Sequence, residues 1–410
     1  MRISSLSIYS NATSQLNSLQ SALARTQMQL STERRILTPA DDPVASARVL
    51  EVSQTKEMNE QFATNRASAR SSLTTVEGAL QNAGNLLQDI QELAVTAGNG
   101  TMLPKDRQLL ATELEGRLAD LLGVANSTDG AGGYLFSGYM ATTQPFTTTP
   151  GGADYKGDQG QRQLQVAASR RMPLSASGSA VFENNPTGNG SFQTQAAAAN
   201  KGSAIISSGS VVDRAQADAG RDSKLTFAVS GTPAVTTYSV VDTTTGTDVA
   251  VPGMTAQAYE AGKAITFGGL SFDIKGEPAD GDNFTAKPSE KQSVFTTVTN
   301  LIAALRAPAD GSSGKAALAN NLATALDNLK SSHDNVLTVQ ASVGAHMKEL
   351  DYLDSAGDDL DIQYAATLSD LQDLDMVKAI SDFSQQQMTL QAAQMSFKTM
   401  SGLSLFNYIS

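Results

Sequence analysis

The chain has 410 residues, of which 29 are basic and 41 acidic, and its formal net charge of -12 disfavours long-range attraction to nucleic acid or to an anionic membrane. The absence of cysteine excludes disulfides, thiol redox chemistry and Cys-ligated zinc, and only His333 and His346 remain as proton shuttles near neutral pH. Most common catalytic sites are therefore excluded, and we expect a chain that is not an enzyme and holds no cofactor or metal.

The amino-terminal segment is interrupted every few positions by polar residues, so it lacks the apolar core and the cleavage site of a secretory signal peptide. No apolar run approaches the roughly 18 residues that a transmembrane helix requires. We expect a chain that stays in solution unless it assembles, with no membrane or nucleic-acid partner.

Apolar residues recur at heptad spacing at both ends of the chain. Near the start they are Tyr9, Leu16, Leu23, Leu30 and Leu37, with Ala12, Leu19 and Thr26 between them. Near the end they are Met376, Phe383, Leu390 and Phe397, with Ile380 between the first two and Ile362 two heptads earlier. A helix of this kind must bury its apolar stripe against a partner, so the pattern predicts a coiled coil.

Charge also favours pairing of the two ends, within one subunit or between subunits. Residues 1–40 carry four Arg and one Glu, a balance of +3, whereas residues 358–410 carry seven Asp and two Lys, a balance of -5. Exposed ion pairs contribute only about 0 to 1 kcal/mol each, so the apolar stripes decide the prediction.

Further heptads predict a helical bundle inside these ends. One stripe runs through Leu73, Val76, Leu80, Ala83, Leu87 and Ile90, and stops at the turn-forming Gly98-Asn99-Gly100. Pro104 suits the first turn of a second helix, which forms an antiparallel hairpin with the first. A late stripe joins them through Leu322, Leu329, Val336, Val343 and Leu350, with His346 at an intervening position as a core or interface residue.

The middle of the chain alternates apolar and polar residues between glycines, which predicts a small β-rich region. The expected strands are residues 134–136, 164–166, 224–229, 237–241, 264–267 and 270–274. Residues 186–210, rich in Ala, Gly, Ser and Asn, are expected to form a mobile loop.

Three polar motifs have structural interpretations. In Thr38-Pro39-Ala40-Asp41-Asp42-Pro43, Asp42 can cap a helix that begins at Pro43, so we interpret Pro39, Asp41, Asp42 and Pro43 as a hinge and cap. Residues 311–315 lack the spacing of a phosphate loop and are interpreted as an interhelix loop. The acidic residues 354–361 lack EF-hand spacing and are interpreted as a solvated hinge at a helix junction.

Residues 30–48 closely resemble the amino-terminal signature of the flagellar hook-associated protein 3 family, and residues 380–393 and 403–409 resemble its carboxyl-terminal end. Segments 133–138, 155–162 and 276–284 are also similar to this family, whose near relative is flagellin. His346 departs from the pattern, because the family usually has Arg there.

The resemblance implies an α+β, flagellin-like fold with inner terminal helices, a bundle with a β-hairpin, and an outer β domain. The expected boundaries are 1–40 for the amino-terminal inner helix, 41–172 and 288–357 for the bundle, 173–287 for the outer domain and 358–410 for the carboxyl-terminal inner helix. The expected assembly interface comprises Leu16, Leu19, Leu23, Leu30, Met376, Phe383, Leu390, Phe397, Leu405 and Phe406.

The resemblance further implies a structural subunit of the extracellular bacterial flagellum that joins the hook to the filament. Its implied partners are copies of itself in a ring, the adjacent hook-associated protein, flagellin, and an export chaperone on the carboxyl-terminal helix. Type III export without signal cleavage would carry it out of the cell. Two alternatives remain open at this point: a flagellin-type filament subunit, and an exported adhesin or enzyme that uses the central β region.

Overall fold

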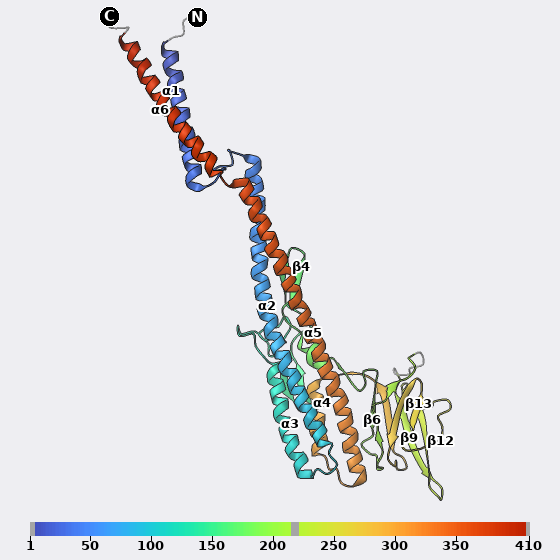
Figure 1. Ribbon diagram of the computed structural model, residues 1–410. Coiled ribbons are helices and arrows are strands. Elements are labelled where there is room, and N and C mark those ends of the chain that lie inside the picture. Colours follow the sequence, from blue (N-terminus) through green and yellow to red (C-terminus); the bar gives the residue numbers. More distant parts are fainter. Residues whose placement is uncertain (1–4, 215–220, 407–410) are drawn as a thin grey trace. The chain divides into compact units, whose positions relative to one another are not determined.

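The structure is a computed structural model that describes residues 5–214 and 221–406 (Figure 1). Helices at both ends of the chain enclose a β-rich middle, which confirms the predicted α+β class. The chain divides into two units: a terminal unit of residues 1–64 and 352–410, and a central unit of residues 65–351.

The terminal unit contains α1 (Ser5–Thr32), α6 (Met376–Phe406), the start of α2 (Pro43–Ala97) and the end of α5 (Gly311–Gln372). The heptad prediction was wrong at Leu37, because α1 ends at Thr32 and Glu33 adopts a left-handed φ of 57° that a helix cannot continue.

The predicted junction at residues 354–361 was also wrong, because α5 runs through it without a break. Gly357 is buried there, and its carbonyl accepts a hydrogen bond of 2.8 Å from Asn59 Nδ2 on α2. The glycine therefore permits close helix packing, while Asp358 and Asp359 are exposed on α5.

In the central unit, α2 and α5 pack with α3 (Pro104–Ala125) and α4 (Val294–Arg306) as a bundle (Figure 1). Antiparallel contacts join α2 to α5, such as the 3.0 Å hydrogen bond from Gln340 Nε2 to Gln81 Oε1. The predicted stripes on α2 and α5 are buried, and the turn between Ala97 and Pro104 is confirmed. Residues 311–315 form the first turn of α5, so the interhelix-loop interpretation was wrong.

Two short hairpins lie beside the bundle, β1–β2 (Phe146–Thr149, Gly152–Tyr155) and β3–β4 (Gln163–Ala167, Arg170–Pro173). The strand predicted at 134–136 is absent from the described residues, where Tyr134 makes only an isolated bridge to Thr128. Its Phe136 instead enters an aromatic cluster with Phe146, Phe182 and Phe295, whose neighbouring rings lie 5.0 to 5.8 Å apart. Phe182 belongs to a π-helical turn, η1 (Ser179–Glu183).

The β region forms two main antiparallel sheets, in the orders β11-β10-β9-β15-β6, with β12 also on β10, and β13-β14-β7, with β8 also on β14. A separate pair joins β5 to β16. The bounds are β5 (Asn185–Pro186), β6 (Phe192–Ala196), β7 (Ile205–Ile206), β8 (Ser210–Val211), β9 (Ser223–Ser230), β10 (Val235–Asp242), β11 (Val249–Ala250), β12 (Gln257–Ala258), β13 (Ala264–Phe267), β14 (Leu270–Lys275), β15 (Asn283–Pro288) and β16 (Lys291–Gln292).

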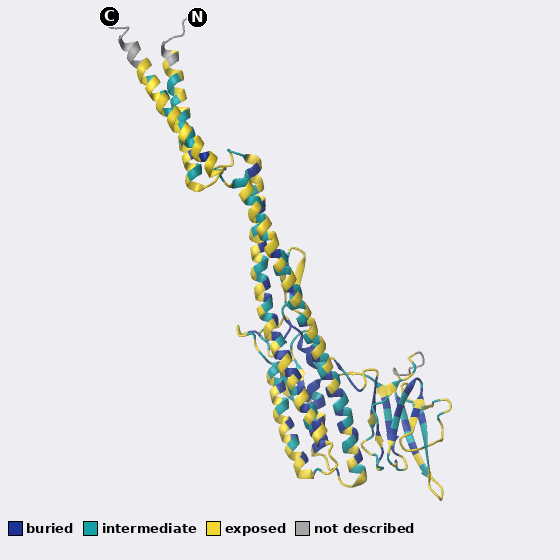
Figure 2. Cartoon of the chain, in the orientation of Figure 1, coloured by how far each residue is buried: buried dark blue, intermediate teal, exposed yellow. Residues whose placement is uncertain are grey.

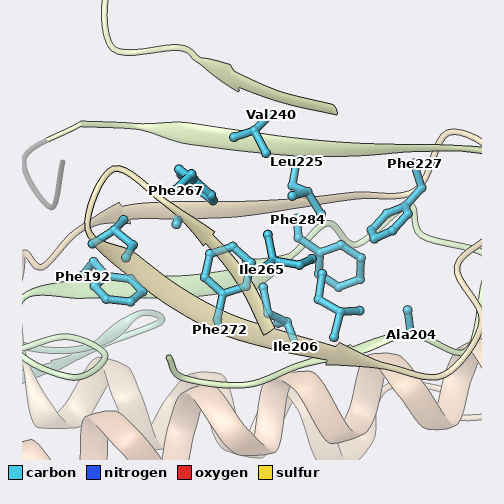
Figure 3. Packing of buried hydrophobic residues seen from close by; sticks show 13 residues of the cluster. Phe192, Ala204, Ile206, Leu225, Phe227, Val240, Ile265, Phe267, Phe272 and Phe284 are labelled. Atoms are coloured by element: carbon cyan, nitrogen blue, oxygen red, sulfur yellow. The ribbon is translucent and has the colours of Figure 1, made fainter. Parts of the chain in front are cut away.

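The two sheets share one apolar core, in which Phe227, Phe272 and Phe284 are almost fully buried (Figure 3). The four strands predicted between residues 224 and 274 are confirmed. The predicted mobile loop at 186–210 was wrong, because Phe192 and Ile206 from this segment belong to the core and hold β6 and β7 in the sheets.

Three asparagines on α5 hold the backbone of the segment that leads into and through the β region. Asn320 accepts from the Ile206 N–H at 2.9 Å and donates to the Ala204 carbonyl at 3.1 Å. Asn328 accepts from the Gly188 N–H at 2.8 Å, and Asn335 donates to the carbonyls of Ala180 and Val181. Because these amides satisfy backbone groups at the joint, they help to fix the β region on α5 through polar contacts.

Candidate assembly surface

α1 and α6 pair in antiparallel orientation along the predicted seam. The Tyr9 and Phe397 rings lie 5.1 Å apart, and the Thr26 hydroxyl lies 3.0 Å from Gln386 Oε1. The seam positions on α1 and α6 that are buried or half-buried are Ala12, Leu16, Leu19, Leu23, Thr26, Leu30, Ala379, Phe383, Gln386, Leu390, Ala393 and Phe397. Spacings of three and four residues on both helices give the geometry of a coiled-coil contact.

The structure places the predicted interface residues as follows. Leu16, Leu19, Leu23, Leu30, Phe383, Leu390 and Phe397 lie half-buried on the seam, and Met376, the first residue of α6, is 38% exposed. Ile380 was a wrong assignment, since it is 53% exposed and the adjacent Ala379 occupies the seam. Ile362 was also wrong, because it is exposed on α5. The side chains of Leu405 and Phe406 lie outside the described residues.

Most of the helix pair is exposed (Figure 2), and the exposed residues include large apolar side chains. Among the α1 and α6 residues whose side chains are described, only Thr26 and Ala379 are buried. Met388 and Met395, 64% and 66% exposed, lie seven residues apart on the side of α6 opposite the seam. Large apolar side chains gathered outside a two-helix contact are typical of a surface that packs against another protein.

The hinge segment is ordered by its two aspartates. Asp42 Oδ1 accepts the Ala45 N–H at 3.0 Å, in the manner of a helix N-cap, and Pro43 is the first residue of α2. Asp41 Oδ2 accepts the N–H groups of Thr38 and Leu37, each at 2.9 Å. Together with the Arg25 guanidinium 2.7 Å away, these hydrogen bonds hold the pKa of the Asp41 carboxyl below its ordinary value.

The predicted role of charge in pairing the two ends of the chain changes with these contacts. The ion pairs that Arg25 and Arg35 make are with Asp41 and Asp42 of the hinge, at 2.7 and 3.7 Å. The ion pairs of these arginines thus stay within the amino-terminal segment, the Arg35 guanidinium also donates to the Leu371 carbonyl of α5 at 2.6 Å, and apolar packing carries the pairing of α1 with α6. Pro39 is exposed in this segment.

Sequence reasoning missed a second break opposite the first. The Arg35 N–H donates to the Gln372 carbonyl at 2.8 Å, and the Leu374 N–H donates to the Glu33 carbonyl at 3.0 Å. Asp375 then accepts the Lys378 N–H at 3.0 Å and caps α6. An aspartate directly before an apolar helical run is a start signal that would have located this break.

His346 lies on α5 with its Nδ1 4.0 Å from Glu349 Oε2, and its side chain is 27% exposed. Glu349 already pairs with Arg170 of β4 at 2.5 Å, and the pKa of Glu349 is lowered chiefly by this hydrogen bond. An acidic partner is therefore present beside the position where an arginine was expected.

No group of three or more His, Asp or Glu side chains among the described residues could hold a metal ion. Within the same part of the chain, no helix is long and apolar enough to cross a membrane.

Comparisons with known proteins place this architecture among flagellar proteins. Residues 3–141 match the family model described as the bacterial flagellin N-terminal helical region. The flagellar junction protein FlgL from Legionella pneumophila has 33% identity and a TM-score of 0.72, over 80% of this chain and 100% of that one. Flagellin of Salmonella budapest is 26% identical, but the match spans 70% of this chain and 59% of that protein.

The similarity to one relative is continuous from end to end. Flagellar hook-associated protein 3 of Salmonella typhimurium is 30% identical over 410 aligned residues, which cover 99% of both chains. The match includes the paired terminal helices, the hinge and the β region, so it covers both units. The chain belongs to the flagellar hook-associated protein 3 family.

Proposed function

We propose that this chain is a structural subunit that joins the flagellar hook to the flagellin filament. The observation that carries the proposal is the uncovered apolar surface of the α1–α6 pair, in a chain whose full length resembles hook-associated protein 3. The family is a structural component of the flagellum, and the function proposed here needs no catalytic centre. Its specificity would come from packing.

The interface we propose comprises Leu16, Leu19, Leu23, Leu30, Met376, Phe383, Leu390, Phe397, Leu405 and Phe406, with Pro39, Asp41, Asp42 and Pro43 as the hinge. We also propose inner helices at 1–40 and 358–410, bundle segments at 41–172 and 288–357, and an outer domain at 173–287. The proposed partners are further copies in a ring, a hook-associated protein on the hook side and flagellin on the other. We further propose export without signal cleavage and a chaperone that covers the carboxyl-terminal helix.

Gene deletion tests the joining role directly. Hooks are expected to persist on the deletion strain, while unpolymerised flagellin leaks into the medium, and the wild-type chain supplied from a plasmid should restore filaments. Normal filaments on the deletion strain would refute the proposal. A filament subunit of the flagellin type would instead be needed along the whole filament, and purified chain would grow long filaments by itself.

Variants of the uncovered face test the observation that carries the proposal. Met388→Gln with Met395→Gln should leave the purified chain as helical as the wild type, because both side chains are exposed. The same double variant should fail to restore filaments. Thr389→Gln, an exposed neighbour changed to the same residue, is the matched control and should restore them. Equal complementation by the double variant and the control would remove this face from the interface.

The adhesin alternative has no support from the described residues or from the relatives found. The sheets of the β region turn their aromatic side chains into the core, where Phe192, Phe227 and Phe284 are at most 1% exposed.

A further inference from the structure

A pocket of about 860 Å³ lies at one end of the bundle in the central unit, where the turn from α2 to α3 meets the start of α5 and β7. Its walls are mostly aliphatic, from residues such as Leu103, Ile205, Leu318 and Leu322. The volume is that of an ordinary ligand pocket.

Arg107 of α3 lines this pocket and is only 8% exposed. Its Nε has no hydrogen-bond partner, and no carboxylate of the described residues forms an ion pair with it. Burying the Nε–H without a partner is unfavourable, because its lost hydration is not replaced by a hydrogen bond. The side chain is therefore held ready for an anion that the described part of the chain does not supply.

The surrounding backbone adds to the positive potential. α3 begins at Pro104 and α5 at Gly311, both on the pocket wall, and Leu103 gives α3 no side-chain cap. The wall thus contains two helix amino-termini and only one helix carboxyl-terminus, that of α2. The sum of the helix dipoles therefore favours an anion in the pocket. The wall also carries two exposed charged residues, Lys315 and Asp310, whose opposite charges offset each other.

The chemistry of the site selects a carboxylate with an apolar neighbour. A guanidinium matches a carboxylate through two parallel hydrogen bonds, and the aliphatic walls suit hydrocarbon. The rim residues Leu103 and Ile205 are 64% and 37% exposed, which favours a protein surface over a fully enclosed small molecule. A chain with 41 acidic residues and a net charge of -12 offers such carboxylates on every further copy.

We propose that the Arg107 pocket binds an Asp or Glu side chain, flanked by apolar residues, from a neighbouring subunit of the flagellum. The proposal rests on the proposed joining function, and it adds a polar contact of the central unit to the apolar packing of the terminal helices. Arg107 would have an ionic partner only when the subunits are assembled.

The test combines Arg107→Met with a control, Arg117→Met, at a half-buried arginine of the same helix that forms ion pairs of 3.7 and 3.8 Å with Asp89 and Asp120. Removing an unpaired buried charge should raise the melting temperature of the purified full chain by about 2 to 4 °C. The control should not raise it. A fall in melting temperature for Arg107→Met would show that Arg107 supports the monomer and would overturn the proposal.

Sodium hexanoate is the probe for the pocket itself. It should raise the melting temperature of the wild type and shift the Arg107 Nε–H resonance, whereas hexanol and sodium chloride at equal concentration should do neither. The effect should be lost in Arg107→Met. An equal response to chloride would overturn the carboxylate assignment, and so would no response to hexanoate.

Complementation of the deletion strain then separates this inference from the proposed function. Wild-type chain should restore filaments, and Arg107→Met should leak at least tenfold more flagellin. If the wild type restores filaments and Arg107→Met does so equally well, the contact with a neighbour is refuted while the joining function stands. If the strain needs no copy of the chain, the joining function itself fails.

Discussion

Asn320 offers a test of how the β region is held on α5. The side chain is 5% exposed and bonds both the Ile206 N–H and the Ala204 carbonyl, which lie on residues that are themselves only 5% and 4% exposed. Asn320→Ala leaves both the Ile206 N–H and the Ala204 carbonyl without this hydrogen-bond partner. Each buried polar group left unsatisfied costs about 1 to 3 kcal/mol of stability. Because the surroundings can rearrange in part, we expect the two groups together to cost about 2 to 4 kcal/mol.

The assay is native-state hydrogen exchange of the amides of β7, since the loss is local and an unfolding curve of the whole chain would mix both units. Exchange of the Ile206 amide should accelerate by about 30-fold or more, which corresponds to 2 kcal/mol. Asn321→Ala is the matched control, because Asn321 is exposed one residue along α5 and gains the same helix propensity. Equal exchange at Ile206 in the two variants would show that these hydrogen bonds do not hold the β region.

Three further perturbations follow from other contacts. Asp42→Ala should destabilise the start of α2 by about 1 kcal/mol, seen as faster exchange of the Ala45 amide, with no effect expected at the centre of the helix. Tyr155→Phe removes a hydroxyl that lies 2.9 Å from the Phe136 carbonyl and 2.6 Å from the Asp158 carbonyl and can donate to either, and the change should cost about 1 kcal/mol in urea unfolding of the central unit. Hydrogen bonds from the N–H groups of Tyr139 and Gly160 lower the folded-state pKa of Asp158, so its contribution is present above the unfolded pKa and is lost as the pH falls below about 4. Exchange protection around Asp158 should therefore fall in acid in the wild type but stay flat in Asp158→Asn, and a parallel fall in both would contradict this.

The helices were the most predictable part of the fold, because their apolar stripes extend over many heptads. Leu73 to Ile90 on α2 and Leu322 to Leu350 on α5 are buried as the pattern required. Helix ends were less predictable: Pro39 indicated the break after α1, but the helix stops earlier, at Glu33, whose left-handed backbone has no strong sequence signal. The acidic residues 354–361 indicated a junction, but α5 continues through them, and Gly357 in this stretch lies in a close helix contact.

Long strands were easier to predict from the sequence than short ones. Eight-residue β9 and β10 have enough alternation to be recognised, whereas β7 and β8 have two residues each and are set by pairing with β14. Such pairings depend on distant residues, so a local pattern cannot reveal them. The same holds for the Arg107 pocket, which arises only when the α2–α3 turn meets the start of α5 and β7.

The contact between Thr26 and Gln386 has a consequence for how α1 and α6 find each other. Leucines at positions 16, 23 and 30 repeat so regularly that either helix could slip by one heptad with little loss of apolar contact. A slip of seven residues would move Thr26 opposite Ala379 or Ala393, and in one direction it would place the half-buried Gln386 amide opposite Leu19. This polar contact, together with the backbone hydrogen bonds between Arg35 and Gln372 and between Leu374 and Glu33, therefore favours the native alignment over its slipped competitors.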